Sequence, residues 1–269
     1  MKDKISTNTN LVVFNRERDM RTMQQLVPLY AENGLNILDL NFCEMMNPVS
    51  SLKDKNKAKS YIESLKRYKS ELGLEYIQCH LPYKRNGESL EDFNNELFLA
   101  LEYVETLEIP VSVIHPIKAN IEQNIEYFES IKSYVPSSTR LAIENMESFD
   151  EIHSVKDLLA IIEKLSYKAG ICLDTGHANI MKEDIPSFIE KAGGNLIATH
   201  IADNNAKEDQ HFLPGFGNIE WEKVVPALKK SYKGYINYEA MFFSRNLPEM
   251  LSKEIIELAK SIGSWLLSL

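Results

Sequence analysis

The sequence predicts an α/β protein that folds as a single (β/α)8, or TIM, barrel, and three observations lead to this fold class. Short apolar segments rich in β-branched residues alternate strictly with amphipathic segments. Strands separated by helices pair in parallel, because each parallel pair needs a crossover connection. Eight such units within a chain of 269 residues match the barrel, which typically needs about 250. No stretch rich in Pro, Gly or Ser divides residues 1–269, so we expect one domain.

The expected strands are nearly continuous apolar runs, which indicates burial on both faces of a parallel sheet. They span residues 11–14, 36–40, 75–80, 111–115, 140–144, 170–174, 195–200 and 234–239. The expected helices place apolar residues three and four positions apart and charged residues on the other face. They span residues 20–34, 58–73, 91–109, 121–135, 155–166, 185–194, 221–232 and 249–268.

An open, doubly wound sheet is the alternative for the same alternation of elements. That fold usually carries a glycine-rich phosphate-binding turn after its first strand. The segment LVVFNRERDM at residues 11–20 contains no glycine. The barrel is therefore favoured, and no nucleotide cofactor is expected.

Composition and charge exclude several classes of function. No apolar run approaches the roughly 20 residues that a membrane span needs, and MKDKISTNTN at the N-terminus lacks the apolar core of a signal peptide. We expect a cytoplasmic protein with no membrane association. The net charge of −9 gives no general attraction to nucleic acid, although a local basic groove remains open. The lysine-rich run at 53–69 contains acids at helical spacing and is expected to be a solvated helix face.

The three cysteines predict buried, reduced thiols. Cys43, Cys79 and Cys172 are odd in number and lie in apolar, strand-like runs. This pattern fits core residues better than a disulfide framework. They are not expected to compete for a metal ion.

Histidines and carboxylates recur where the expected strands end, which is where active sites of this barrel lie. The set comprises His80, His115, Glu144, Asp174, His177, His200, Asp209, His211 and Glu239. It includes every histidine except His153, which begins a helix. One histidine at a strand end is usually structural, but so many carboxylates sharing a pocket need cations to offset their repulsion. We therefore expect a metal site. Imidazole and carboxylate ligands suit Zn²⁺ or Mn²⁺, and Co²⁺ is a further candidate.

Seven motifs carry a resemblance to a known superfamily over nearly the whole chain. They are CHLPY at 79, IHP at 114, IENM at 143, CLDTGHAN at 172, HIADN at 200, DQHFLPGFGNIEW at 209 and YEA at 238. The chain resembles the xylose isomerase-like TIM barrels, which include sugar isomerases and epimerases and the endonuclease IV group of abasic-site nucleases. CLDTGHAN and the D-x-H-x-x-x-G-x-G stretch are specific for the superfamily and much less so for the reaction.

The epimerase branch of this resemblance implies one divalent metal ion held by Glu144, Asp174, His200 and Glu239. Glu144 and Glu239 would face opposite sides of the carbon that loses its proton, and the metal would stabilise the resulting enediolate. His177 would hold or polarise a substrate oxygen. The expected substrate is a small carbohydrate: a sugar, a sugar phosphate or a keto-polyol. The resemblance is also compatible with a homodimer.

The nuclease branch implies a different use of the same residues. His80, His115, His177, Asp209 and His211 would join the four ligands in a three-zinc cluster that activates water for attack on a phosphodiester. All nine positions are filled here, but many isomerase-like members also retain these residues. The count therefore does not decide between the branches, and a dehydratase, a lyase or a non-catalytic binding protein remains a third alternative.

Other features bear on this choice. The segment NFCEMMNPVSS has no basic residue before Lys53, where the nuclease pattern places a basic DNA-contacting loop. Nucleic acid is therefore a less favoured partner.

The ketose epimerase pattern has an arginine six residues after the strand-seven histidine, where this chain has Ala206. Candidate replacement cations are Arg16, Arg18 and Arg245, and candidate pocket walls are Phe14, Tyr83, Phe216 and Trp221.

Overall fold

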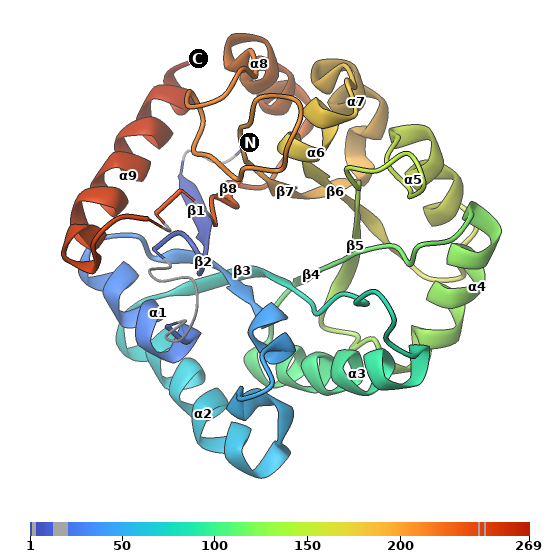
Figure 1. Ribbon diagram of the computed structural model, residues 1–269, viewed down its shortest axis with the longest axis horizontal. Helices are drawn as coiled ribbons and strands as arrows, with labels where there is room; N and C mark the ends of the chain where they lie inside the picture. The colour runs from blue at the N-terminus through green and yellow to red at the C-terminus, as the bar shows by residue number, and fades with distance from the viewer. Residues whose placement is uncertain (2–3, 13–20, 242, 245) are drawn as a thin grey trace.

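The eight strands form a ring surrounded by helices (Figure 1), which confirms the predicted barrel. The computed structural model describes residues 1–269 except 2–3, 13–20, 242 and 245. The strands are β1 (Ile5–Asn8), β2 (Ile37–Asn41), β3 (Glu75–His80), β4 (Val111–Ile114), β5 (Arg140–Glu144), β6 (Gly170–Asp174), β7 (Leu196–His200) and β8 (Ile236–Tyr238). Neighbouring strands pair in parallel, and β1 pairs with both β2 and β8. A parallel bridge between Ile201 and Tyr238 brings β7 against β8 and closes the ring.

Helices cover the outside of the ring, and side-chain caps fix where many of them begin. They are α1 (Met23–Glu32), α2 (Lys55–Glu71), α3 (Leu90–Leu107), α4 (Ile121–Ile131), α5 (Val155–Ile162), α6 (Thr175–Ile180), α7 (Ile185–Ala192), α8 (Trp221–Ser231) and α9 (Ser252–Ser268). Helix α2 begins three residues before the predicted start because the Asp54 carboxylate accepts hydrogen bonds from the Asn56 and Lys57 amides. Helix α6 was not predicted, since its six residues are too few to show a helical period.

The predicted strand at 11–14 is wrong, because the first strand is the polar segment Ile5–Asn8. Leu11 and Val12 lie in a turn, although both are buried in the core. The Val12 amide donates to the Tyr30 hydroxyl at 3.2 Å, and that hydroxyl donates to the Thr9 carbonyl at 2.9 Å. The apolar run therefore reflects tertiary packing rather than strand pairing. Residues 13 and 14 lie outside the described residues.

The residues inside the barrel form two layers, because side chains alternate along a strand. In the lower layer, Val113, Ala142, Cys172 and Ala198 form a small apolar cluster separate from the main core. The same layer contains three polar residues: Asp39 of β2, Gln78 of β3 and Asn237 of β8. The side chains of Gln78 and Asn237 both donate hydrogen bonds to the carboxylate of Asp39. The upper layer consists of residues that each follow a lower-layer residue by two positions in the sequence. They are His80, His115, Glu144, Asp174, His200 and Glu239. The strand period therefore places the predicted histidines and carboxylates in one plane at the carboxyl end of the barrel.

The cysteines are only partly as predicted. Cys79 and Cys172 are buried in β3 and β6. Cys43 is instead half-buried in a 3-10 helix, η1 (Phe42–Met46), with its Sγ 3.3 Å from Nδ1 of His80. Its neighbour Phe42 is fully buried in the core. Among the described helices, none combines the length and the apolar character that crossing a membrane requires.

Candidate metal centre

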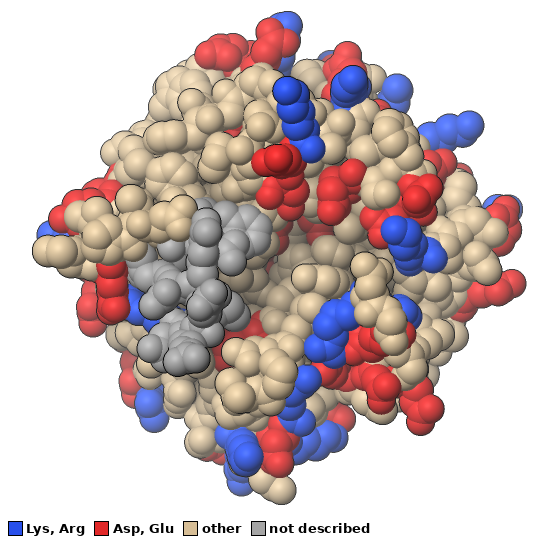
Figure 2. Space-filling model, in the orientation of Figure 1, with Lys and Arg blue, Asp and Glu red and all other residues tan. Residues whose placement is uncertain are grey.

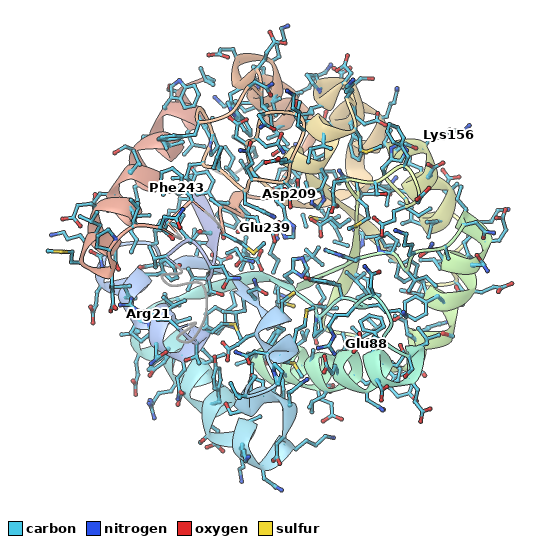
Figure 3. The ribbon with its side chains drawn as sticks, viewed as in Figure 1. Arg21, Glu88, Lys156, Asp209, Glu239 and Phe243 are labelled. Atoms are coloured by element: carbon cyan, nitrogen blue, oxygen red, sulfur yellow. The ribbon has the colours of Figure 1, made fainter. Side chains whose placement is uncertain are left out.

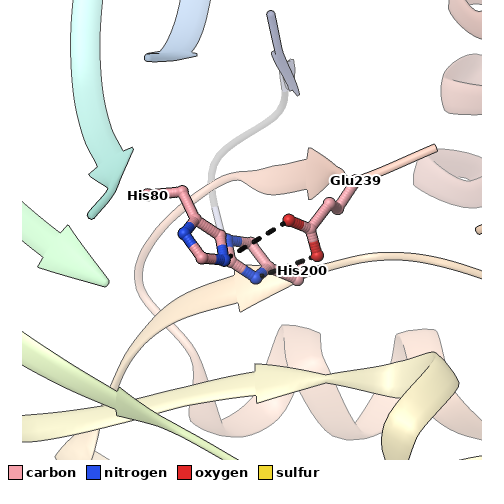
Figure 4. A group of neighbouring side chains, drawn as sticks. All are labelled: His80, His200 and Glu239. Atoms are coloured by element: carbon pink, nitrogen blue, oxygen red, sulfur yellow. Dashed lines mark ion pairs between the residues drawn. The ribbon is translucent and has the colours of Figure 1, made fainter. Parts of the chain in front are cut away.

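Four of the predicted residues meet at the carboxyl ends of β5, β6, β7 and β8. Glu144, Asp174, His200 and Glu239 each offer a ligand atom, and these atoms all lie within 4.8 Å of one another. All four side chains are at most 2% exposed. Nδ1 of His200 lies 2.6 Å from Oε1 of Glu144 and 3.2 Å from Oε2 of Glu239. Figure 4 shows the Glu239 carboxylate facing both His80 and His200, and Figure 3 places Glu239 near the middle of the ring.

The residues of this cluster fit a divalent cation. Oδ2 of Asp174 and Oε1 of Glu239 are buried without a hydrogen-bond partner among the described residues. Burial raises the pKa of Asp174, and the nearby Glu144 carboxylate raises it further. Burial also raises the pKa of Glu239 well above its usual range. Three carboxylates thus lie together out of water, where a cation offsets both their desolvation and their mutual repulsion. One imidazole nitrogen and several carboxylate oxygens are donors that suit Zn²⁺ and Mn²⁺.

Glu144 and Glu239 differ in their electrostatic surroundings. Burial opposes the ionisation of Glu144, but the His200 imidazole, aided by His115, outweighs it and lowers the pKa well below its usual range. The pKa of Glu239 shifts in the opposite direction, because burial outweighs the effect of His200. Two carboxyl groups whose pKa values are shifted in opposite directions beside one site are suited to general acid and general base roles.

His80 and His115 form a second group against the other oxygen of Glu144. Nε2 of His115 lies 3.1 Å from Oε2 of Glu144 and 3.2 Å from Nε2 of His80. Burial, with the neighbouring His115, lowers the pKa of His80 to about 4. The ring of Tyr83 stacks on His115 with centroids 5.0 Å apart. His80, His115 and Glu144 offer ligand atoms close enough to hold a second cation, or they could bind substrate hydroxyl groups.

His177, Asp209 and His211 form a third group on the α6 side of the site. Oδ2 of Asp209 lies 2.5 Å from Nε2 of His211 and 3.6 Å from Nε2 of His177. Asp174 joins this group to the first, because its Oδ1 caps α6 by accepting from the His177 amide at 2.7 Å. Burial lowers the pKa of His211, but the hydrogen bond and negative charge of Asp209 outweigh this effect and raise the pKa to about 9. All nine residues predicted from the strand ends therefore lie at one site.

A cavity of about 690 Å³ opens above the nine residues. Seven of them line it, whereas Asp174 and His200 lie beneath its floor. Figure 2 shows the surface hollowed near its centre, with acidic side chains above the hollow and basic ones to its lower right. The lining residues that sequence reasoning missed include Lys84, Arg85 and Lys118. The available signal was their position in the loops just after His80 and His115.

The predicted pocket walls and cations are only partly supported. Tyr83 lines the cavity, but Phe216 and Trp221 are not among its described lining residues. Trp221 is instead buried, and its indole N–H donates to Asp203 at 2.9 Å. Phe14, Arg16, Arg18 and Arg245 lie outside the described residues. His153 lies 3.4 Å from Glu183 and is absent from the described cavity lining.

The loop that carries Asp209 and His211 is organised by the buried carboxylate of Asp203. Its two oxygens accept hydrogen bonds from the amides of Asn204, Gly215 and Ile219 and from the Trp221 indole. The main chain of Asp203 also pairs with that of Phe212 in an isolated antiparallel bridge. The glycine-rich turn thus closes around Asp203, which keeps the loop over the site.

We expect Gly217→Ala to destabilise the protein by about 1–3 kcal/mol, as overpacking does. A Cβ at Gly217 would overlap Oδ1 of Asp203 and the main chain of Asn204, which cannot move away cheaply. Denaturant unfolding measures the loss. Gly194→Ala is the matched control, because a Cβ there meets nothing within 4 Å. Equal stability of the two variants would contradict this account of the turn.

The sequence is similar to those of known proteins. A family model described as xylose isomerase-like TIM barrel matches residues 27–262. Protein y4fM of Sinorhizobium fredii is 24% identical over 226 residues, which is 78% of this chain and 68% of the relative. Fructoselysine 3-epimerase of Escherichia coli O157:H7 is 25% identical over 79 residues, 29% of each chain. Probable endonuclease 4 of Clostridium beijerinckii is 27% identical over 180 residues, 55% of this chain and 64% of the relative.

Solved structures have the same fold. The IolI protein with a bound zinc atom superposes with a TM-score of 0.74 and 17% identity, covering 98% of each chain. A D-tagatose 3-epimerase-like protein superposes with a TM-score of 0.67 and 22% identity, covering 97% of this chain and 98% of the other. At these identities the likeness concerns the fold alone, whereas the family model spans most of the sequence. The chain belongs to the xylose isomerase-like TIM barrel family.

Proposed function

We propose that the protein is a divalent-metal-dependent isomerase or epimerase of a small sugar, sugar phosphate or keto-polyol. The observation that carries the proposal is the meeting of Glu144 and Glu239, from β5 and β8, at one nitrogen of His200. Two carboxyl groups that reach one point from different strands can serve opposite faces of a bound carbon. The similarity to a fructoselysine 3-epimerase and to a D-tagatose 3-epimerase-like structure supports this class of reaction.

In this proposal Glu144, Asp174, His200 and Glu239 would hold the metal ion, which polarises a substrate carbonyl when bound. Glu144 or Glu239 removes the proton from the carbon beside the carbonyl, and the other returns a proton to the opposite face. His177 lines the cavity, where its Nε2, 3.6 Å from Asp209, would contact a substrate oxygen. Tyr83 forms an aromatic wall beside His115.

Solvent-deuterium exchange tests the proposed reaction without knowledge of the natural substrate. The metal-loaded protein is incubated in D₂O with a panel of ketoses, ketose phosphates and keto-polyols, and the products are examined by NMR. We expect deuterium at a carbon beside the carbonyl of at least one compound. A panel that shows no exchange with the metal bound would count against the proposal.

A zinc-dependent abasic-site nuclease is the second candidate, and the grouping of all nine histidines and carboxylates favours it. The match to a probable endonuclease 4 points the same way. Against it, the described residues between Asn41 and Lys53 include no basic side chain before Lys53, and Lys53 itself pairs with Glu96 at 2.5 Å. Cleavage of a duplex with a synthetic abasic site by the zinc-loaded protein tests this candidate.

Metal content separates the two candidates, and we expect about one Mn²⁺, Co²⁺ or Zn²⁺ per chain. Only the cluster of Glu144, Asp174, His200 and Glu239 combines four ligand atoms among the described groups. Elemental analysis of protein purified without added metal or chelator measures the ratio. About three zinc ions per chain would mean that the other two groups are also filled, and would favour the nuclease.

A further inference from the structure

The histidines at the site orient their rings in two different ways. His80, His177 and His211 each place Nδ1 2.8–2.9 Å from a main-chain carbonyl oxygen, of Leu81, Asn145 and Glu239 respectively. A carbonyl oxygen can only accept a hydrogen bond, so Nδ1 carries the proton in each ring. Nε2 then points away from the main chain: it lies 2.5 Å from Oδ2 of Asp209 in His211 and 3.2 Å from Nε2 of His115 in His80. The main chain thus fixes the orientation of these three rings.

His200 is turned the other way. Its Nδ1 faces the carboxylates of Glu144 and Glu239, so its Nε2 points down into the barrel. Among the described residues no main-chain carbonyl accepts a hydrogen bond from this nitrogen, and Oδ2 of Asp39 lies 3.4 Å from it. His200 and Asp39 are both fully buried. The nitrogen that would carry the proton of a metal-binding His200 therefore faces a carboxylate rather than water.

Asp39 is held in place by side chains of the lower layer. Its Oδ2 accepts from Nε2 of Gln78 at 3.1 Å and from Nδ2 of Asn237 at 2.9 Å. Both amide nitrogens also reach the carbonyl oxygen of Thr199, the residue before His200. The group thus connects β2, β3 and β8 to the strand that carries the histidine.

Packing alone does not require a carboxylate at this position. On the other side of the barrel the same layer is filled by small apolar side chains, those of Val113, Ala142, Cys172 and Ala198. Burying a carboxylate instead is costly unless it is paired. Residues that bind a metal through one imidazole nitrogen commonly donate the other N–H to a carboxylate, which fixes the ring and makes it a stronger ligand. The position of Asp39 matches this role.

We propose that Asp39 is a positioning residue, which accepts the Nε2 proton of His200 and so leaves Nδ1 unprotonated for a divalent cation. Gln78 and Asn237 hold the carboxylate in place. The proposal rests on the metal site proposed above and not on the identity of the sugar. It gives the polar half of the lower layer a function in metal binding.

Asp39→Asn tests the proposal, because the amide has nearly the same shape and no negative charge. Chelator competition measures the affinity for Zn²⁺, and we expect a 10- to 100-fold loss. The visible absorption of the Co²⁺-loaded protein, which reports the metal's ligands, is expected to change as well. Ser112→Ala is the control: it removes a buried hydroxyl that bonds to Thr139, on the outward face of β4, and should leave affinity and spectrum unchanged.

A structural role alone predicts a different result, in which Asp39→Asn melts earlier but keeps the wild-type affinity and Co²⁺ spectrum. That result would overturn the proposal. If Asp39→Asn fails to fold, Gln78→Met removes one donor to Asp39 without a change in charge and should lower Zn²⁺ affinity several-fold; wild-type affinity would again overturn it. His200→Ala separates the two proposals: loss of metal there, with wild-type affinity in Asp39→Asn, removes only the role of Asp39.

Discussion

Replacing Glu144 or Glu239 by glutamine is expected to lower the rate of epimerisation by about 10²- to 10⁴-fold, which is the usual contribution of general acid–base catalysis. Glutamine keeps the size of the side chain but cannot exchange a proton with a substrate carbon. Each variant should retain some solvent exchange from the face that its remaining carboxylate serves. We therefore expect the two variants to differ in which epimer loses its proton.

The measurement needs two safeguards, because both residues are also proposed metal ligands. Rates are compared at metal concentrations that saturate each variant, and the bound metal is measured in the same samples. Glu151→Gln is the matched control, since Glu151 also lines the cavity and belongs to none of the candidate ligand groups. Near-wild-type epimerisation by metal-loaded Glu144→Gln would exclude a two-carboxylate reaction.

The strand ends could be predicted from the sequence because two periods act together. For every strand but the first, strand–helix alternation indicates where the strand ends, and the two-residue period then places His80, Glu144 and Glu239 on the inner face. Both signals are local, so they survive in a single sequence. These two signals, together with the closure of the ring, bring the nine residues to one site.

The parts that could not be predicted depend on long-range contacts. The segment Ile5–Asn8 is mostly polar although it is largely buried, and only its pairing with β2 and β8 makes it a strand. Asp39 looks like an ordinary polar interruption between Leu38 and Leu40 until the ring brings β7 close to it. Lys84 lies in a loop whose position over the cavity depends on the whole barrel.

His200→Ala is expected to lose the metal ion and with it the stability that the metal provides. A ligand at 100 times its Kd stabilises the native state by about 2.7 kcal/mol, and for a chain of this size that corresponds to a shift in Tm of roughly 5–10 °C. The shift between metal-free and metal-loaded protein is the quantity to compare, because removing a fully buried imidazole also lowers the stability of the metal-free fold.

Comparing the metal-dependent shift in Tm of His200→Ala with that of a control variant shows whether the metal ion binds at His200. His153→Ala removes a histidine outside the candidate ligand groups, so its metal content and its metal-dependent shift should equal those of the wild type. In His200→Ala the shift should vanish, because three buried carboxylates remain without the neutral ligand at which Glu144 and Glu239 meet. Persistence of the full shift there would place the metal in one of the other two groups, with His80 and His115 or with His177 and His211, and would redirect both the epimerase mechanism and the role of Asp39.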